Sequence, residues 1–207
     1  MLQEDTNLSK VLVEDRKTGQ ECIFDGLGRT VSTIQEYWQW AYSSLLGNTE
    51  RGNFAEYLVA VALGIADTTR IEWDKYDLKS PSGITVEVKA SGYLQTWSQK
   101  ELSKPKFSIR PTKAWDYETN QYEETIKRQA EVYVFCIHNH KKKDEGLNPL
   151  DLNQWEFYVL PTKVLDETMP TQKTISLERV QSLGAISASF GELRDVIEHC
   201  LDERPAQ

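Results

Sequence analysis

Residues 77–89 read DLKSPSGITVEVK, and we expect the rest of the chain to fold around this stretch. Pro81 and Gly83 lie in its middle, and both are turn residues that often join two strands. After the turn, apolar and polar residues alternate from Ile84 to Lys89, which is the two-residue period of a strand with one buried face. The stretch therefore predicts a β-hairpin with an apolar face and a polar face.

Three charged side chains share the polar face of this predicted hairpin. If Leu78 pairs with Ile84 across the loop, Asp77 and Glu87 become diagonal neighbours, about 7–8 Å apart, and Lys89 follows along the same face. Two carboxylates can hold Mg²⁺, which lowers the pKa of a bound water, and a lysine can orient that water or steady negative charge. Such a set suits phosphodiester cleavage. A solvated sheet face carries the same alternation, so the hairpin alone leaves both interpretations open.

A further carboxylate is predicted on the helix that precedes the hairpin. Residues 49–63 have apolar residues at helical spacing, and Glu56 is the only charged residue in their apolar part. A buried carboxylate needs a partner, so Glu56 is a candidate site residue. If the helix began at Asn53, Glu56 would instead be an ordinary capping glutamate in the first turn. A helix that begins at residues 48–49 places Glu56 in its middle.

The rest of the chain predicts a mixture of helices and strands. Residues 32–46 have a helical period, and Thr33-Ile34-Gln35-Glu36 could supply a cap near its start. Trp38 and Trp40 are expected to be packing residues and not ligand contacts. Residues 132–137 form a continuous apolar run, which predicts a strand buried on both faces. The polar residues 117–127 predict a loop or a short helix. Further strands are predicted at 70–78, 107–109, 155–160 and 174–176, and further helices at 161–165, 177–183 and 190–201.

Length and composition indicate one domain in a reducing compartment. The 207 residues suit an N-terminal arm (1–30) and a single domain (31–207), with a core at 49–160 and a helical extension at 161–207. No apolar run approaches the roughly 18 residues of a membrane span, and the acidic start does not resemble a secretory signal. Three widely spaced cysteines indicate neither zinc nor a disulfide framework, so we expect a cytoplasmic protein.

The charge distribution argues against a protein coated in nucleic acid but leaves room for a local binding patch. The net charge is −8, from 24 basic and 32 acidic residues. The basic stretch that follows the hairpin supplies the candidate phosphate contacts Lys100, Lys104, Lys106, Arg110 and Lys113. A solvated loop with ordinary lysines is the alternative interpretation.

Two polar pairs outside the hairpin are weaker candidates. His138 and His140 follow the buried strand, and we expect a loop at the strand end rather than a metal site, because no acids or cysteines lie nearby in the sequence. Gln95 and Gln99, beside Trp97, could contact nucleic acid, and an ordinary surface loop would show the same residues.

In its order of elements, the chain resembles the PD-(D/E)XK nuclease superfamily, which has the restriction-endonuclease-like fold. The resemblance covers roughly residues 49–160 and is carried by Glu56, Asp77 and the Glu87-Val88-Lys89 tripeptide. It implies an α/β fold of the α+β type, in which helices flank a mixed sheet with an αβββαβ core. Tyr76 stands where the superfamily's name has proline, and Gln95 or Gln99 would match a glutamine that some members carry.

The resemblance implies a Mg²⁺-dependent endonuclease that hydrolyses phosphodiester bonds in DNA, with Mn²⁺ as a substitute ion. Asp77, Glu87, the Val88 carbonyl and Glu56 would hold the metal, and Lys89 would position the attacking water. Cleavage of both strands of a duplex would call for a homodimer, and no membrane contact is expected. The alternative is a nuclease-like module that binds DNA or a protein partner without turnover.

Overall fold

The computed structural model describes residues 14–70, 75–116 and 121–202. Its helices are α1 (Ile34–Tyr42), α2 (Asn48–Leu63), η1, a 3₁₀ helix (Leu152–Gln154), α3 (Thr162–Thr168), α4 (Leu177–Ser182) and α5 (Leu193–His199). Its strands are β1 (Cys22–Phe24), β2 (Thr30–Thr33), β3 (Leu78–Lys79), β4 (Thr85–Gly92), β5 (Lys106–Ser108), β6 (Thr112–Asp116), β7 (Gln121–Lys127), β8 (Val132–His138), β9 (Trp155–Pro161), β10 (Thr174–Ser176) and β11 (Ile186–Ala188).

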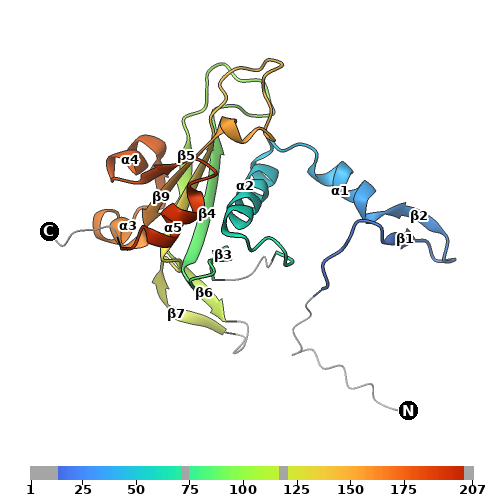
Figure 1. The fold of residues 1–207 in the computed structure, drawn as a ribbon, viewed down its shortest axis with the longest axis horizontal. Coiled ribbons are helices and arrows are strands. Elements are labelled where there is room, and N and C mark those ends of the chain that lie inside the picture. The colour runs from blue at the N-terminus through green and yellow to red at the C-terminus, as the bar shows by residue number, and fades with distance from the viewer. Residues whose placement is uncertain (1–13, 71–74, 117–120, 203–207) are drawn as a thin grey trace, which may run out of the picture.

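A mixed sheet in the order β11-β9-β8-β4-β3 forms the centre of the molecule (Figure 1). Strands β4 and β8 are parallel, whereas the β3–β4, β8–β9 and β9–β11 pairs are antiparallel. Every residue of β8 is buried, as its continuous apolar run predicts. The sheet is flanked by helices, so the predicted α+β class with a mixed sheet is confirmed.

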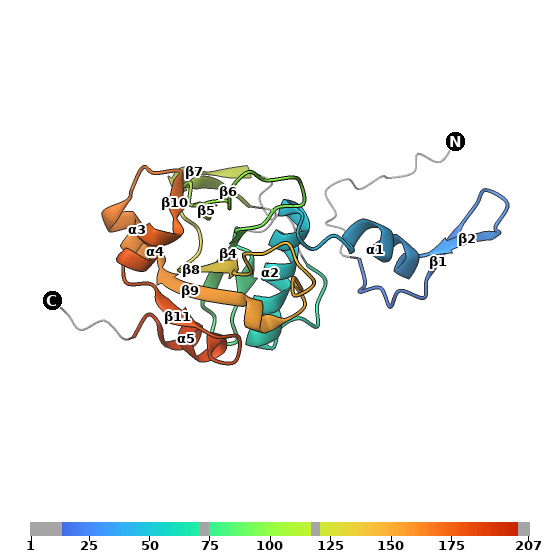
Figure 2. The ribbon, with the colours of Figure 1, turned by 90° about the horizontal axis from the view of Figure 1, so that it is seen from above.

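Both faces of the central sheet are covered, by two separate hydrophobic clusters. On one face, Val86 and Val88 of β4 join apolar residues of α2 and α5. On the other face, alternate residues of β8 such as Phe135 pack against β5, β10, α3 and α4. Figure 2 shows α2 and α5 on one side of the sheet and α3 and α4 on the other. The polar residues of β4 therefore lie on a face that a second cluster largely covers, not on a solvated one.

The predicted hairpin is present, with a different register. Strand β3 pairs antiparallel with β4, but Leu78 lies opposite Val86 and not opposite Ile84. The reason is a turn within the loop, where the Gly83 N–H donates to the Ser80 carbonyl and the Ser80 N–H donates to the Ile84 carbonyl. Continuing this register by one residue places Asp77 directly across from Glu87, so the predicted diagonal arrangement was wrong.

Helix α2 settles the position of Glu56. The helix begins at Asn48 and ends at Gly64, whose φ of 74° is the left-handed conformation that favours glycine at a helix end. Asn53 is therefore not an N-cap, and Glu56 lies in the middle of the helix, where it is buried. The predicted apolar stripe is confirmed at Leu58 but is wrong at Val61, which is 39% exposed.

Strands β1 and β2 and helix α1 form a unit that projects from the rest of the chain (Figure 1). We call the described residues 14–42 the N-terminal unit. Helix α1 begins with a capping box between Thr33 and Glu36, as its sequence predicts. No residue of α1 is buried, and the prediction that both tryptophans are packing residues was wrong for Trp40, which is 85% exposed.

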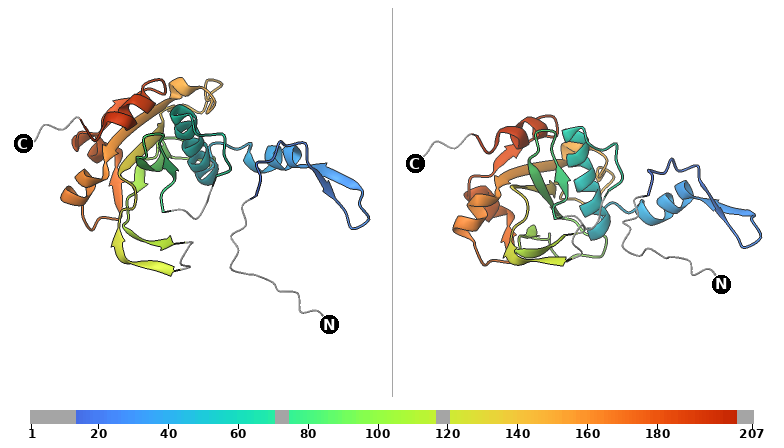
Figure 3. Two further views of the ribbon diagram at one scale, coloured as in Figure 1. Left: turned by 60° about the horizontal axis from the view of Figure 1, so that its bottom comes forward. Right: turned by 90° about the horizontal axis from the view of Figure 1, so that it is seen from below.

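The connection from β4 to β8 also differs from expectation. The αβββαβ pattern has a helix before its last strand, whereas the described residues of this connection contain β5, β6 and β7 and no helix. Residues 121–127 are therefore a strand and not a loop or short helix, and residues 117–120 lie outside the described residues. Strand β5 pairs with β10, away from the central sheet, and the β6–β7 ribbon extends from the body (Figure 3).

Two further predicted elements are shorter in the structure than expected. The strand expected over residues 70–78 is assigned only from Leu78, and residues 71–74 lie outside the described residues. The predicted C-terminal helix is present but shorter, as α5. Over the described ranges, no helix combines the length and apolar character needed to cross a membrane.

Candidate active site

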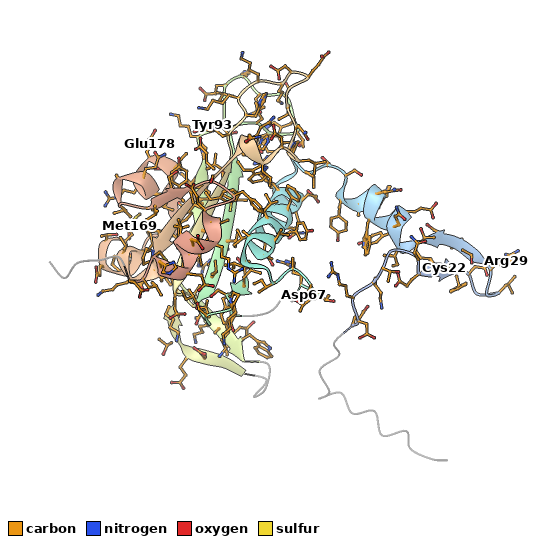
Figure 4. All side chains as sticks on the ribbon, viewed as in Figure 1. Cys22, Arg29, Asp67, Tyr93, Met169 and Glu178 are labelled. Carbon is orange, nitrogen blue, oxygen red and sulfur yellow. The ribbon has the colours of Figure 1, made fainter. Side chains whose placement is uncertain are left out.

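A cleft of about 440 Å³ lies between α2 and the start of the hairpin. Glu56 and Tyr57 line it from the helix, and Arg70, Tyr76 and Asp77 line it from the segment that leads into β3. Asp67, which also lines the cleft, is labelled in Figure 4 at the turn below α2. Two of the predicted site residues, from different elements, thus share one concave surface.

Asp77, Glu87 and Lys89 are brought together by the hairpin. The Lys89 ammonium lies 2.5 Å from Glu87 Oε1 and 3.9 Å from Asp77 Oδ2. Asp77 Oδ2 also accepts a hydrogen bond of 2.7 Å from the backbone N–H of Val88. All three charged side chains are only about a quarter exposed. The predicted acid, acid and amine therefore form one contacting cluster at the edge of the central sheet.

The Val88 backbone fixes the orientation of this cluster. Because the N–H and C=O of one strand residue point to the same side of the strand, the Val88 carbonyl faces the edge where Asp77 lies. Strand β3 ends before this point, since its pairing with β4 covers only Leu78 and Lys79. The short first arm of the hairpin leaves backbone groups of β4 beside the two carboxylates.

The surroundings of Glu87 disfavour the charged form of its carboxylate. Burial raises the pKa of Glu87, because removal from water disfavours the charged form, and the nearby Asp77 carboxylate adds to the rise. The Lys89 ammonium acts in the opposite direction and lowers the Glu87 pKa, but it does not cancel the effect of burial. Tyr133 of β8 lies opposite Glu87 in the parallel register and belongs to the second hydrophobic cluster. The carboxylate thus sits at the margin of an apolar layer.

Glu56 has a partner that the sequence did not reveal. The Arg70 Nε lies 2.8 Å and 2.9 Å from the two Glu56 carboxylate oxygens, and Arg70 Nη2 lies 2.8 Å from Oε2. Burial raises the pKa of Glu56, the bond to Arg70 lowers it, and the Asp77 carboxylate raises it. Its apolar neighbours indicated that a buried Glu56 needs a partner, but only the tertiary fold shows that this partner is Arg70.

The predicted site carboxylates divide into two groups, and only Glu56 and Asp77 line the cleft itself. Asp77 and Glu87 share Lys89, whereas both Glu56 oxygens accept from Arg70. Within the described ranges, no three His, Cys, Asp or Glu side chains converge closely enough to form a ready metal cage. The oxygen donors in place for a cation are therefore those of Asp77 and Glu87, with the Val88 carbonyl beside them.

The five predicted phosphate contacts are all on the surface. Lys100 and Lys104 lie in the loop after β4, and Lys106 lies in β5. Arg110 and Lys113 line a shallow depression together with two exposed apolar residues of β7, Tyr122 and Ile126. All five basic side chains are exposed, and their role in binding stays a prediction.

The remaining polar candidates belong to the scaffold. His138 is buried at the end of β8 with its ring 5.3 Å from that of Trp155, and burial lowers its pKa to about 4. His140 instead contacts Asp144, so the two histidines do not form a metal-binding pair. Gln95 is buried and donates to the Gly92 carbonyl, so it supports the loop after β4.

Arg51 of α2 links this helix to the loop after β4 that carries Gln95 and Gln99, and nothing in the sequence singled it out. Arg51 is 2% exposed and donates to the Leu46 and Leu94 carbonyls at 2.5 Å and 2.9 Å. Gln99 completes the same loop, because its side-chain oxygen accepts from the Gln95 N–H at 2.7 Å. These contacts link the start of α2 to the end of β4, the strand that carries Glu87 and Lys89.

Comparison with known protein families identifies a family that the chain matches. The family model described as bacteriophage T4 endonuclease IV matches residues 17–179, which is well over half of the chain and includes the whole cleft. A comparison with curated protein sequences finds no match.

Proposed function

Because the chain belongs to the bacteriophage T4 endonuclease IV family, we propose that the Asp77–Glu87–Lys89 cluster is the active site of a Mg²⁺-dependent endonuclease acting on DNA. The observation that supports this most is the contact of one amine with two half-buried carboxylates beside an open cleft. The arrangement agrees with the site expected of the PD-(D/E)XK superfamily.

The donor set fits a magnesium ion. Mg²⁺ prefers oxygen ligands and commonly takes one or two carboxylates while it keeps several waters. Asp77, Glu87 and the Val88 carbonyl would hold it, and Mn²⁺ would occupy the same oxygens. When bound, Mg²⁺ supplies positive charge to a phosphate oxygen and lowers the pKa of an associated water. Glu56 would join this set only after releasing Arg70, so we place it as a surrounding residue and not as a direct ligand in the free protein.

The protein's own groups have distinct parts in this proposal. Lys89 orients the attacking water and stabilises the negative charge that develops on the phosphate. Glu87 keeps Lys89 in place through their contact of 2.5 Å. Arg70, which lines the cleft and is 44% exposed at its side chain, presents a second positive group to an incoming phosphate.

DNA binding would extend from this cleft over the exposed basic residues. Lys100, Lys104, Lys106, Arg110 and Lys113 would contact phosphates, so binding would weaken as salt concentration rises. One such site cuts one strand, and double-strand cleavage would therefore use two copies of the chain.

The test is cleavage of plasmid and of single-stranded DNA with Mg²⁺, with Mn²⁺ and with a chelator. We expect cleavage with either metal and none with the chelator. The variant Glu87→Gln should lose cleavage, whereas Glu178→Gln, an exposed residue in the first turn of α4, should keep it. Equal cleavage by wild type and Glu87→Gln would disprove the proposed site.

A further inference from the structure

The N-terminal unit carries more exposed apolar surface than a free surface element needs. Its exposed large hydrophobic side chains are Ile23, Phe24, Leu27, Val31, Tyr37, Trp38, Trp40 and Tyr42. In the described part of the chain they make up half of all such residues, although the unit is a small part of it. Trp40 and Leu27 are 85% and 79% exposed. None of the described residues covers this surface.

The size of this surface is close to that of a protein interface. The five exposed aromatic side chains alone present roughly 400–700 Å², if each exposes 150–250 Å² when fully free. The three aliphatic residues add to this area. The largest apolar patch of an ordinary monomer is about 300–600 Å², and a typical interface buries about 800 Å² per partner. Summed over all sides of the unit, the exposed apolar area approaches that of one half of a stable interface.

The exposed apolar residues lie on more than one side of the N-terminal unit, and a second molecule can reach them. Ile23 and Phe24 are neighbours in β1, so their side chains point to opposite sides of the hairpin. Helix α1 likewise has exposed aromatic residues and no buried ones. The unit also projects away from the body in every view (Figures 1, 2 and 3), so a second molecule can reach it without collision with the cleft.

The charge of the unit disfavours nucleic acid as its partner. Residues 14–42 contain five acidic and three basic side chains, and a phosphate backbone would be repelled by this balance. The acids are also engaged locally, since Asp25 pairs with Arg29 and Glu36 caps α1. Figure 4 shows Arg29 and Cys22 in the hairpin of the unit, remote from the cleft. An apolar surface with little free charge can be buried against the same apolar surface of a second copy.

We infer that the N-terminal unit is a dimerisation surface, on which the units of two copies of this chain pack against each other. The two-fold arrangement is the commonest in homo-oligomers and lets one patch cover itself. It places two clefts in one particle, one from each copy. The inference rests on the exposed surface and does not depend on whether the cleft cuts DNA.

The test is the mass of the full-length chain in solution, measured by sedimentation equilibrium at low and at high salt. We expect a dimer at both, because apolar association is not screened by salt. The double variant Phe24→Ser/Trp40→Ser should be a monomer at concentrations where the wild type is a dimer. Trp97→Ser is the matched control, since Trp97 is 56% exposed but lies in the loop after β4. This control should remain a dimer.

Circular dichroism melting separates loss of the interface from loss of the fold. The body's transition should be unchanged in the double variant, because neither side chain is buried. A wild type that stays monomeric at its highest soluble concentration would overturn the inference. A double variant that remains a dimer would also overturn the inference, whether or not it loses DNA binding.

Discussion

The pair formed by Glu56 and Arg70 allows a quantitative test of how the cleft is built. Arg70 contacts both oxygens of a carboxylate whose side chain is only 9% exposed. Loss of one partner from a fully buried pair costs about 3–5 kcal/mol, but the Arg70 side chain is 44% exposed and is therefore partly screened. We expect Arg70→Ala to lower the free energy of unfolding by about 1–2 kcal/mol. For a chain of this size that is roughly 2–8 °C in Tm.

The pH dependence of this loss follows from the Glu56 pKa. Burial already raises it above its usual value of 4.5, and removal of Arg70 raises it further because the bond to Arg70 lowers it. A carboxylate with a raised pKa binds its proton more tightly in the folded than in the unfolded state. The folded state therefore loses stability as pH rises through the folded-state pKa. Arg70→Ala should thus be more destabilising at about pH 8 than at about pH 5.

Urea unfolding of four proteins checks this reasoning. The double variant Glu56→Gln/Arg70→Ala should recover part of the loss, because the uncompensated charge is gone. Arg29→Ala is the matched control, since Arg29 contacts Asp25 with similar distances but is 74% exposed. Because water screens this exposed pair, Arg29→Ala should cost clearly less stability than Arg70→Ala. If Arg70→Ala is as stable as the wild type at both pH values, or if Glu56→Gln restores nothing, the carboxylate does not depend on Arg70.

Three further changes have defined outcomes. Burial raises the pKa of Glu87, so replacing this carboxylate by Glu87→Gln should leave the metal-free protein at least as stable as the wild type at neutral pH. Added Mg²⁺ should no longer raise the Tm of this variant. A clear fall in the Tm of the metal-free variant would contradict this reasoning. Gly92→Ala places a Cβ 3.3 Å from the Arg51 guanidinium and should cost about 1–3 kcal/mol in urea unfolding, whereas no change would show that Arg51 moves freely. Arg128→Met should cost about 2–4 kcal/mol, because the buried guanidinium donates to Asp166 and to backbone carbonyls; a shift of the urea midpoint measures it.

The features that the sequence predicted correctly are those with a local physical cause. The alternation after Gly83 is enough to fix which residues of β4 face the core, and the strand at 132–137 follows from its unbroken apolar run. The capping box at Thr33 depends on two residues three positions apart. Each of these signals acts within one element, so no knowledge of the tertiary fold is needed to interpret it.

The features that the sequence missed depend on contacts between distant segments. Helical spacing in α1 cannot show whether anything covers the helix, and Trp40 is exposed because the unit projects from the body. Strand β7 is polar and mostly exposed, so it lacks the apolar period that would distinguish it from a loop. The hairpin register was wrong by two residues on β4 because a hydrogen-bonded turn at Ser80 sets it, and composition does not specify that turn.

The charges of the site support the proposed binding of a cation. The Asp77 carboxylate raises the pKa of both Glu56 and Glu87, and both glutamates have raised pKa values because burial outweighs their basic partners. Arg70 and Lys89 offset two of the three negative charges. A fold that needed only stability would place apolar residues here, since a buried ion pair is often no better than a packed hydrophobic one. The arrangement is reasonable if a divalent cation or the phosphate it accompanies restores the balance, and in that case metal binding and folding stability must rise together.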